Sequence, residues 1–321
     1  MTVPIIVVVA ALSAFLGVGG YLFHRACVRV PDLPWLDREA MLKTNHAPHV
    51  DMIQRAQAFL TEHDAKDVWI ESGDGLKLHG LWVAAEEPIA TVLLVHGYHS
   101  TKLVDFGGSM AYFHRQGLNL LIPDQRCHGQ SEGRYITFGV KESKDMLCWL
   151  QYLNKEHWQG PVVMSGLSMG ASTVMFMADE DLPENVKGLL VDCGFTSPAD
   201  IIGKVFRDVT HLPPKPWIYA AELFARVFGH FSLWEKSSLK TLPHNKLPIF
   251  MAHGKADDFV PCEMTRKAFE VCGGDKQMYL VEGAGHGVSF MVDKQGYSAA
   301  VRATLKKALG ETYELRADKK Q

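Results

Sequence analysis

The stretch Met164-Ser-Gly-Leu-Ser-Met-Gly-Ala-Ser-Thr173, MSGLSMGAST, continues a short apolar run that begins at Val162. Within it, Ser168 lies between Gly166 and Gly170 at the spacing G-x-S-x-G. This spacing is typical of a sharp turn from a strand into a helix, in which the serine takes a strained backbone conformation and exposes its hydroxyl. Glycine is also common in ordinary strand–helix turns, so the pentapeptide predicts a nucleophile at Ser168 only if suitable partners occur elsewhere.

The segments around this turn alternate regularly. A hairpin is expected first, with strands at 67–71 and 76–83 joined at Gly73-Asp-Gly75. Short apolar runs typical of strands buried on both faces then recur at 91–95, 118–122, 162–164, 186–191, 249–252 and 277–281. Helical segments such as 140–156 and 261–272 separate them. The order predicts an α/β fold, with a mostly parallel central sheet of about eight strands and helices on both faces.

The N-terminus has a different composition. Residues 3–23, VPIIVVVAALSAFLGVGGYLF, carry no charge, and 21 residues at helical rise span about 31 Å, close to one hydrocarbon thickness. No Lys or Arg precedes the run, which favours a retained single-pass membrane helix over the alternatives of a cleaved signal peptide or a buried helix. We therefore expect a membrane anchor at 1–30, a helical connector at 31–65 interrupted at Pro48, and the main domain at 66–321.

The composition of the chain excludes several classes of protein. The 321 residues are 47% hydrophobic and 21% charged with a net charge of −3, which is typical of a globular protein with a sizeable core. Without a basic run, no nucleic-acid partner is expected. Six scattered cysteines without CxxC spacing predict free thiols. The sequence does not determine the oligomeric state.

Two downstream loops offer partners for Ser168. The stretch His253-Gly-Lys-Ala-Asp-Asp-Phe-Val-Pro261 follows a predicted strand and supplies a carboxylate, either Asp257 or Asp258. The glycine-rich stretch 282–287, EGAGHG, follows the last strand and supplies an imidazole at His286. A serine nucleophile requires a base that an acid orients, and the ends of parallel strands meet on one edge of a sheet. The order Ser…Asp…His therefore predicts a catalytic triad.

Residues 66–310 resemble the α/β-hydrolase superfamily, and within it the serine aminopeptidase-like group of bacterial hydrolases. The resemblance rests on the stretch around Ser168 and on LLVHGYHS (93–100), DQRCHGQSEG (124–133), HGKADDFVP (253–261) and GAGHG (283–287). It implies that Ser168 is the nucleophile, Asp257 the acid and His286 the base. Asp257 is preferred because the family pattern places the acid four residues after His253; Asp258 is then expected to cap the following helix.

The loop after the strand at 91–95 is expected to form an oxyanion hole. The backbone N–H groups of Tyr98 and Met169 are the predicted donors, and His96 is expected to orient the loop. His128 and His253 are interpreted as loop packing. The H-x-x-H pairs at 46/49 and 96/99 lack a carboxylate companion, so we expect no metal. The sequence has no phosphate-binding or dinucleotide-binding glycine motif, so we expect no organic cofactor.

Between the strands at 186–191 and 249–252 lie more than fifty residues rich in aromatic side chains. We expect part of this segment, about 195–245, to form a helical cap over Ser168 that favours an apolar acyl group. Glu222 is the one carboxylate in the predicted second cap helix. The expected function is cleavage of an ester or thioester through an acyl-enzyme intermediate. Peptide or amide hydrolysis is the alternative, and a non-catalytic relative of the same fold is the third possibility.

The charges beside the apolar N-terminal run predict its orientation. Only the terminal amine precedes the run, whereas His24, Arg25, Arg29, Arg38 and Lys43 follow it. Positive residues near a membrane segment tend to remain in the cytoplasm, so this distribution favours a cytoplasmic catalytic domain.

Overall fold

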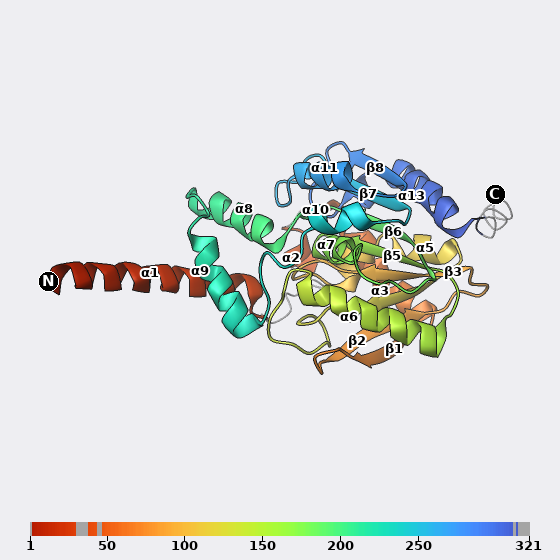
Figure 1. Cartoon of the computed structure of the whole chain (residues 1–321). Helices are drawn as coiled ribbons and strands as arrows, with labels where there is room; N and C mark the ends of the chain where they lie inside the picture. The colour runs from red at the N-terminus through yellow and green to blue at the C-terminus, as the bar shows by residue number, and fades with distance from the viewer. Residues whose placement is uncertain (1, 30–37, 44–46, 311–312, 314–321) are drawn as a thin grey trace.

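A computed structural model describes residues 2–29, 38–43, 47–310 and 313 of the chain (Figure 1). Its centre is an eight-stranded sheet in the order β1-β2-β4-β3-β5-β6-β7-β8. The strands are β1 Lys66–Glu71, β2 Lys77–Val83, β3 Ala90–Val95, β4 Leu118–Pro123, β5 Val162–Leu167, β6 Val186–Asp192, β7 Ile249–Gly254 and β8 Lys276–Val281. The pairs β1–β2 and β2–β4 are antiparallel and the other neighbours are parallel. The predicted strands and the mostly parallel sheet are confirmed.

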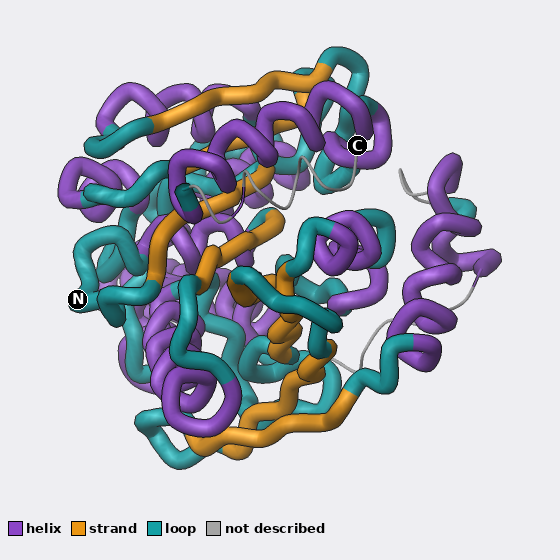
Figure 2. Tube along the Cα trace, turned by 90° about the vertical axis from the view of Figure 1, so that its right-hand side faces the viewer, coloured by secondary structure: helices purple, strands orange, loops and turns teal. Residues whose placement is uncertain are grey.

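Helices lie on both sides of the strands, as Figure 2 shows. The α-helices of the main body are α2 Arg38–Met41, α3 Val50–Glu62, α4 Lys102–Phe106, α5 Met110–Arg115, α6 Val140–Tyr152, α7 Met169–Phe176, α10 Ser238–Thr241, α11 Cys262–Val271, α12 Ser289–Val292 and α13 Lys294–Leu309. Short 3₁₀ turns η1 Ala47–His49 and η4 Leu242–His244 and the π-helical turn η2 Leu153–His157 complete them. Pro48 lies in η1, directly before α3.

The two faces of the sheet bury separate cores because successive strand residues point to opposite sides. Val92 and Leu94 of β3 pack with helices α3, α4, α5 and α13 in one core. Leu93 and Val95 pack with α6, α7 and α11 in the other. With a core on each face, β3 to β6 are almost fully buried, which is why they read as continuous apolar runs.

The apolar N-terminal segment forms one long helix, α1 Thr2–Cys27, that projects from the body (Figure 1). Its portion Ile5–Cys27 is long and apolar enough to cross a membrane. The two residues after α1 are fixed to the main body. Val28 forms a β-bridge with Tyr135, and the Arg29 guanidinium donates to the carbonyl oxygens of Gly129 and Ser131 at 2.8 and 2.7 Å.

The segment between β6 and β7 contains α8 Pro198–Thr210, α9 Trp217–Phe224 and the π-helical turn η3 Ala225–Gly229. We call these three elements the cap helices. They project from the same side of the body as α1, and α9 lies beside the C-terminal half of α1 (Figure 1). One apolar cluster joins Phe23 and Cys27 of α1 to Ile218 and Ala221 of α9.

Candidate active site

Ser168 lies at the turn between β5 and α7 in a backbone conformation that non-glycine residues rarely adopt. Its φ is 56° and its ψ is −118°, while β5 ends at Leu167 and α7 begins at Met169. The Ser168 backbone N–H donates to the Asp192 carbonyl oxygen at 2.9 Å, which ties the turn to the end of β6. Such strain persists only where the surroundings hold it, and it is a feature of functional sites.

The two glycines allow the backbone segments at this turn to approach one another closely. A Cβ atom at Gly166 would lie 2.3 Å from the Gly170 carbonyl oxygen, and a Cβ at Gly170 would lie 1.8 Å from the Val95 carbonyl oxygen. Any side chain at either position would push β5, α7 or the loop after β3 away. The G-x-S-x-G spacing is therefore a packing requirement of this turn.

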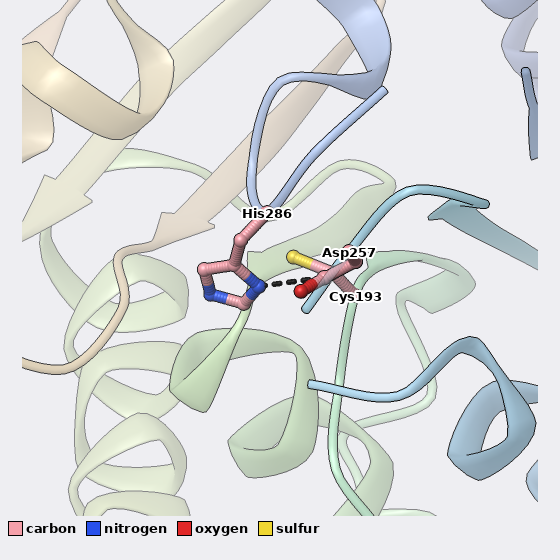
Figure 3. A group of neighbouring side chains, drawn as sticks. All are labelled: Cys193, Asp257 and His286. Carbon is pink, nitrogen blue, oxygen red and sulfur yellow. Dashed lines mark hydrogen bonds and ion pairs between the residues drawn. The ribbon is translucent and has the colours of Figure 1, made fainter. Parts of the chain in front are cut away.

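The structure brings together the three predicted triad residues from the ends of three strands. His286, on the loop after β8, has Nε2 2.8 Å from Ser168 Oγ and Nδ1 2.7 Å from Asp257 Oδ2. Figure 3 shows the imidazole pointing toward the Asp257 carboxylate. The contacts fit a neutral imidazole whose Nδ1–H donates to the carboxylate and whose Nε2 accepts from the serine hydroxyl. This arrangement suits a general base beside a nucleophile.

Asp257 is buried and extensively hydrogen-bonded. Its Oδ1 accepts the backbone N–H groups of Phe259 and Val260 at 3.0 and 2.9 Å, and its Oδ2 lies 3.1 Å from His253 Nε2. Burial alone would raise the pKa of Asp257, but hydrogen bonds from His253 and His286 outweigh it and hold the pKa below its ordinary value. The carboxylate therefore stays ionised and holds His286 in one orientation.

The prediction for Asp258 is wrong. Helix α11 begins at Cys262 with Pro261 at its N-cap and no side-chain cap, so Asp258 does not cap it. The backbone carbonyl of Asp258 accepts a hydrogen bond from Lys204 Nζ, and its side chain lies at the border of the cleft described below. The buried neighbour Asp257, which accepts the backbone N–H groups of Phe259 and Val260, stabilises this turn instead.

The loop after β3 is fixed by two buried side chains. His96 donates from Nδ1 to the Gly97 carbonyl and accepts at Nε2 from the Gln125 N–H at 3.0 Å, and burial lowers its pKa to about 3. Asp105 accepts from the Gly97 N–H and the Ser100 hydroxyl, both at 2.5 Å. These contacts fit the expected loop-orienting role of His96. They use both nitrogens of His96, which leaves neither for a metal; His46 of the other pair lies outside the described residues.

Comparison with known proteins places this geometry in context. Residues 86–240 match the family model described as serine aminopeptidase, S33. The chain is 28% identical to YqkD of Bacillus subtilis over 240 residues, which cover 74% of this chain and 77% of that protein. The esterase Pf2001 of Pyrococcus furiosus superposes with a TM-score of 0.63 at 23% identity, covering 78% of this chain and 96% of the esterase. The esterase EaEST of Exiguobacterium antarcticum gives a TM-score of 0.56 at 18% identity, covering 75% and 100%.

The chain has the α/β-hydrolase fold.

Ser168 and His286 border a cleft of about 560 Å³. Its wall is formed by the loop after β3, the turn after β7 and the loop after β8, with the lining residues Gly97, Tyr98, Ser100, Val104, Asp105, Leu167, Ala256, Asp258, Phe259, Gly285 and Gly287. Met169 is the first residue of α7, where a helix N–H has no acceptor within the helix. Tyr98 and Met169 thus stay the predicted oxyanion donors.

The expectation that aromatic side chains of 195–245 cover Ser168 needs correction. Within the described part of the chain, the residues that line the cleft include none from that segment. The cap aromatics pack elsewhere: Phe224 and Phe228 lie beside Phe23 of α1, each with ring centroids 6.4 Å from that of Phe23. The cap helices pack against α1, and their side chains are not among the residues that line the cleft.

Glu222 has a structural role within the cap. It is buried and accepts hydrogen bonds from Arg226 Nε at 2.5 Å, Ser232 Oγ at 2.6 Å and the Leu233 N–H at 2.7 Å. Since it does not line the cleft, it is not placed to bind a substrate amine.

Cys193 is a neighbour of the triad that sequence reasoning did not identify. Its Sγ and the ligand-type atoms of Asp257 and His286 lie within 4.8 Å of one another, as a metal site would require (Figure 3). Burial and the nearby Asp192 and Asp257 carboxylates raise the pKa of the Cys193 thiol well above its ordinary value. Metal binding requires the thiolate, which the raised pKa of Cys193 disfavours. Because His286 also contacts Ser168 and Asp257, this set of side chains does not fit a metal site.

Asp105 was missed as well. Burial raises its pKa to about 6, against the two hydrogen bonds that favour the charged form. Asp105 lies within the short helix α4, and no sequence motif identifies it. Its hydrogen bond with Gly97, eight residues earlier, forms only because the chain folds back.

Proposed function

We propose that the chain is a membrane-anchored serine hydrolase that cleaves esters of apolar acyl groups. The observation that carries the proposal is the continuous set of contacts from Asp257 through His286 to Ser168, with Ser168 and His286 bordering one open cleft. Esterase neighbours with the same fold support hydrolysis in general. Ester specificity and the residue roles are part of the proposal.

The proposed reaction has two halves. Ser168 Oγ attacks the acyl carbon while its proton passes to His286 Nε2, and the resulting imidazolium is stabilised by Asp257. The imidazolium then gives this proton to the leaving alkoxide, which departs as the alcohol and leaves an acyl-enzyme. In the second half, a water molecule loses a proton to His286 and attacks the acyl carbon; Ser168 recovers that proton as the acid is released.

Charge on the substrate oxygen develops only in the tetrahedral intermediates. The N–H groups of Tyr98 and Met169 are the proposed donors to this oxygen, and a single such donor typically contributes about 3–4 kcal/mol to transition-state stabilisation. Asp105 and His96 act here as positioning residues, because they fix the loop that carries Tyr98.

The cleft supports an apolar acyl group over a substrate with a free α-amine. Tyr98, Val104, Leu167 and Phe259 supply apolar lining. Recognition of an ammonium group would require carboxylates aimed into the cleft. The Asp105 carboxylate already accepts hydrogen bonds from Gly97 and Ser100 of the loop after β3. Asp258 is the other carboxylate among the residues that line the cleft. Peptide or amide hydrolysis is therefore the second candidate. A purely binding role is disfavoured by the complete set of triad contacts.

The acyl preference is tested with para-nitrophenyl esters from acetyl to decanoyl, compared with aminoacyl para-nitroanilides. We expect kcat/KM to rise with chain length by up to about fourfold per methylene until the apolar wall is covered, because each buried methylene contributes up to about 0.8 kcal/mol. A series that is flat or falls from acetyl upward would contradict the apolar-cleft proposal. Faster cleavage of the aminoacyl anilides would favour the second candidate.

The anchor is the other part of the proposal. Helix α1 has the length and composition of a single span. The charged residues that follow it favour a cytoplasmic catalytic domain, which stays a prediction from the charge distribution.

A further inference from the structure

Helix α1 has two different halves. Residues 5–14 are exposed on every side, and they include Ile5, Val9 and Leu12. From Phe15 onward the helix packs against the cap, beginning with the ring of Trp217, whose centroid lies 6.3 Å from that of Phe15. The apolar surface of the first half therefore has no partner within the described chain.

The second half of α1 fits closely against α9. A Cβ atom at Gly19 would lie 2.4 Å from Ala220 Cβ, and one at Gly20 would lie 3.1 Å from the Phe224 ring. Small residues that bring two helix backbones together in this way are typical of helix pairs in membranes. Because Phe15 contacts Trp217 and Phe23 contacts Phe228, the two helices run in the same direction along this contact.

The length of the exposed first half of α1 determines how far the membrane must extend along the pair of helices α1 and α9. Residues 3–14 form a helix of about 18 Å, whereas the hydrocarbon layer is about 30 Å thick. The missing 12 Å or so corresponds to about eight further residues, 15–22, which are the residues that lie against α9. A spanning α1 therefore carries α9 into the membrane with it.

The outer surface of the cap helices suits that environment. Tyr219, Leu223, Val227 and Phe228 are exposed large apolar side chains on α9 and η3. The carboxylate of α9, Glu222, is buried and paired with Arg226. Arg226 of η3 is exposed among these side chains, and its guanidinium is paired with Glu222. The apolar side chains around it match the exposed surface of α1 in composition.

The tip between α8 and α9, on the Trp217 side of the contact with α1, carries both apolar and basic exposed side chains. Exposed Val209 and Leu212 lie near Arg207 and Lys215. Long basic side chains can bury their aliphatic stems while their charged ends reach the phosphate layer. Both Lys215 and Arg207 therefore tolerate a position at or below the membrane surface.

We propose that α9 and η3 lie in the same leaflet as the second half of α1, so that the cleft opens at the membrane surface and receives its acyl ester from the lipid phase. The cleft borders this region, since the Tyr98 hydroxyl donates to the Ala26 carbonyl of α1 at 2.9 Å. The inference rests on the proposed anchor and ester hydrolase.

Depth is measured on the full chain in vesicles of phosphatidylcholine and phosphatidylglycerol. Single variants Val9→Cys, Leu223→Cys and Val271→Cys carry an environment-sensitive fluorophore, and lipids with spin-labelled acyl chains serve as quenchers. Val271 on α11 is the matched control, because its exposed fraction of 40% is close to the 47% of Leu223. Cys148 and Cys262 are partly exposed, so unsubstituted protein labelled in parallel gives the background.

We expect strong quenching at positions 9 and 223 and background quenching at 271. Quenching at position 9 without quenching at 223 would overturn the cap inference and leave the anchor intact. Absence of quenching at both would overturn the anchor and the inference together.

Activity gives a second readout. Leu223→Asp should lower hydrolysis of a long-chain ester embedded in vesicles by roughly tenfold, since it places a charge in the apolar layer. Hydrolysis of para-nitrophenyl acetate in solution should change less than about twofold, because Leu223 does not line the cleft. Equal rates for Leu223→Asp and Val271→Asp on the vesicle substrate would overturn the proposal. If the unsubstituted protein hydrolyses neither substrate, the proposed hydrolase function itself is contradicted.

Discussion

Replacing Ser168 with alanine should lower kcat by about 10⁴–10⁶-fold, with an unchanged unfolding midpoint to within a few degrees. The loss is large because the hydroxyl is the proposed nucleophile, and the fold survives because only one oxygen is removed from a turn. His286→Ala should be about as severe, and the double variant no worse than either single one, since the members of a triad act as a unit. Rates are measured with the best ester of the acyl series.

Ser165→Ala is the matched control for this experiment. Ser165 lies three residues earlier in the same stretch and is similarly buried, but it has no contact with His286 among the described hydrogen bonds. It should keep activity within a few fold. Comparable losses in Ser165→Ala and Ser168→Ala, with both proteins folded, would contradict the assignment of the nucleophile.

Asp257→Asn should lower kcat by about 10⁴-fold, whereas Asp258→Asn should stay within a few fold of the unsubstituted enzyme. An amide at position 257 cannot stabilise the imidazolium, and its N–H group can face His286 Nδ1 and favour the wrong tautomer. The adjacent Asp258 lies at the cleft border, whereas the hydrogen bond from His286 Nδ1 goes to Asp257. Steady-state kinetics of both variants, with circular dichroism as the check on folding, decide between the two residues.

A larger loss in Asp258→Asn than in Asp257→Asn would show that the wrong carboxylate has been assigned. Thermal unfolding adds an independent check. Since the pKa of Asp257 is lowered in the folded state, its contribution to stability is present above the ordinary carboxyl pKa and is lost as the pH falls through the lowered value. Asp257→Asn should therefore be less stable than Asp258→Asn at neutral pH, and the difference should shrink in strong acid.

Local patterns in the sequence were sufficient for the sheet and the triad geometry. The strands β3 to β7 are almost fully buried, which produces continuous apolar runs, and the turn at Ser168 requires Gly166 and Gly170 for close packing. The three triad residues follow strands, and parallel strands end on one edge of a sheet. Their meeting therefore follows from topology once the strands are recognised.

Contacts that depend on long-range packing were not predictable in this way. The cap aromatics were expected over Ser168, but the chain turns them toward α1, where Gly19 and Gly20 allow a close fit. Composition gives the apolar character of a helix and not the neighbour it selects. Asp105 and Cys193 were missed for a similar reason, since the contact of Asp105 with Gly97 and the proximity of Cys193 to Asp257 and His286 arise only when the chain folds.

The central claim is that Ser168 is an activated nucleophile in the folded protein. The most direct measurement is reaction of the full chain with a fluorophosphonate probe, followed by mass spectrometric location of the adduct. We predict a single adduct on Ser168 in the folded enzyme and none on Ser168→Ala or on heat-unfolded protein. Failure of the folded enzyme to react, or an adduct on a different serine, would contradict the claim.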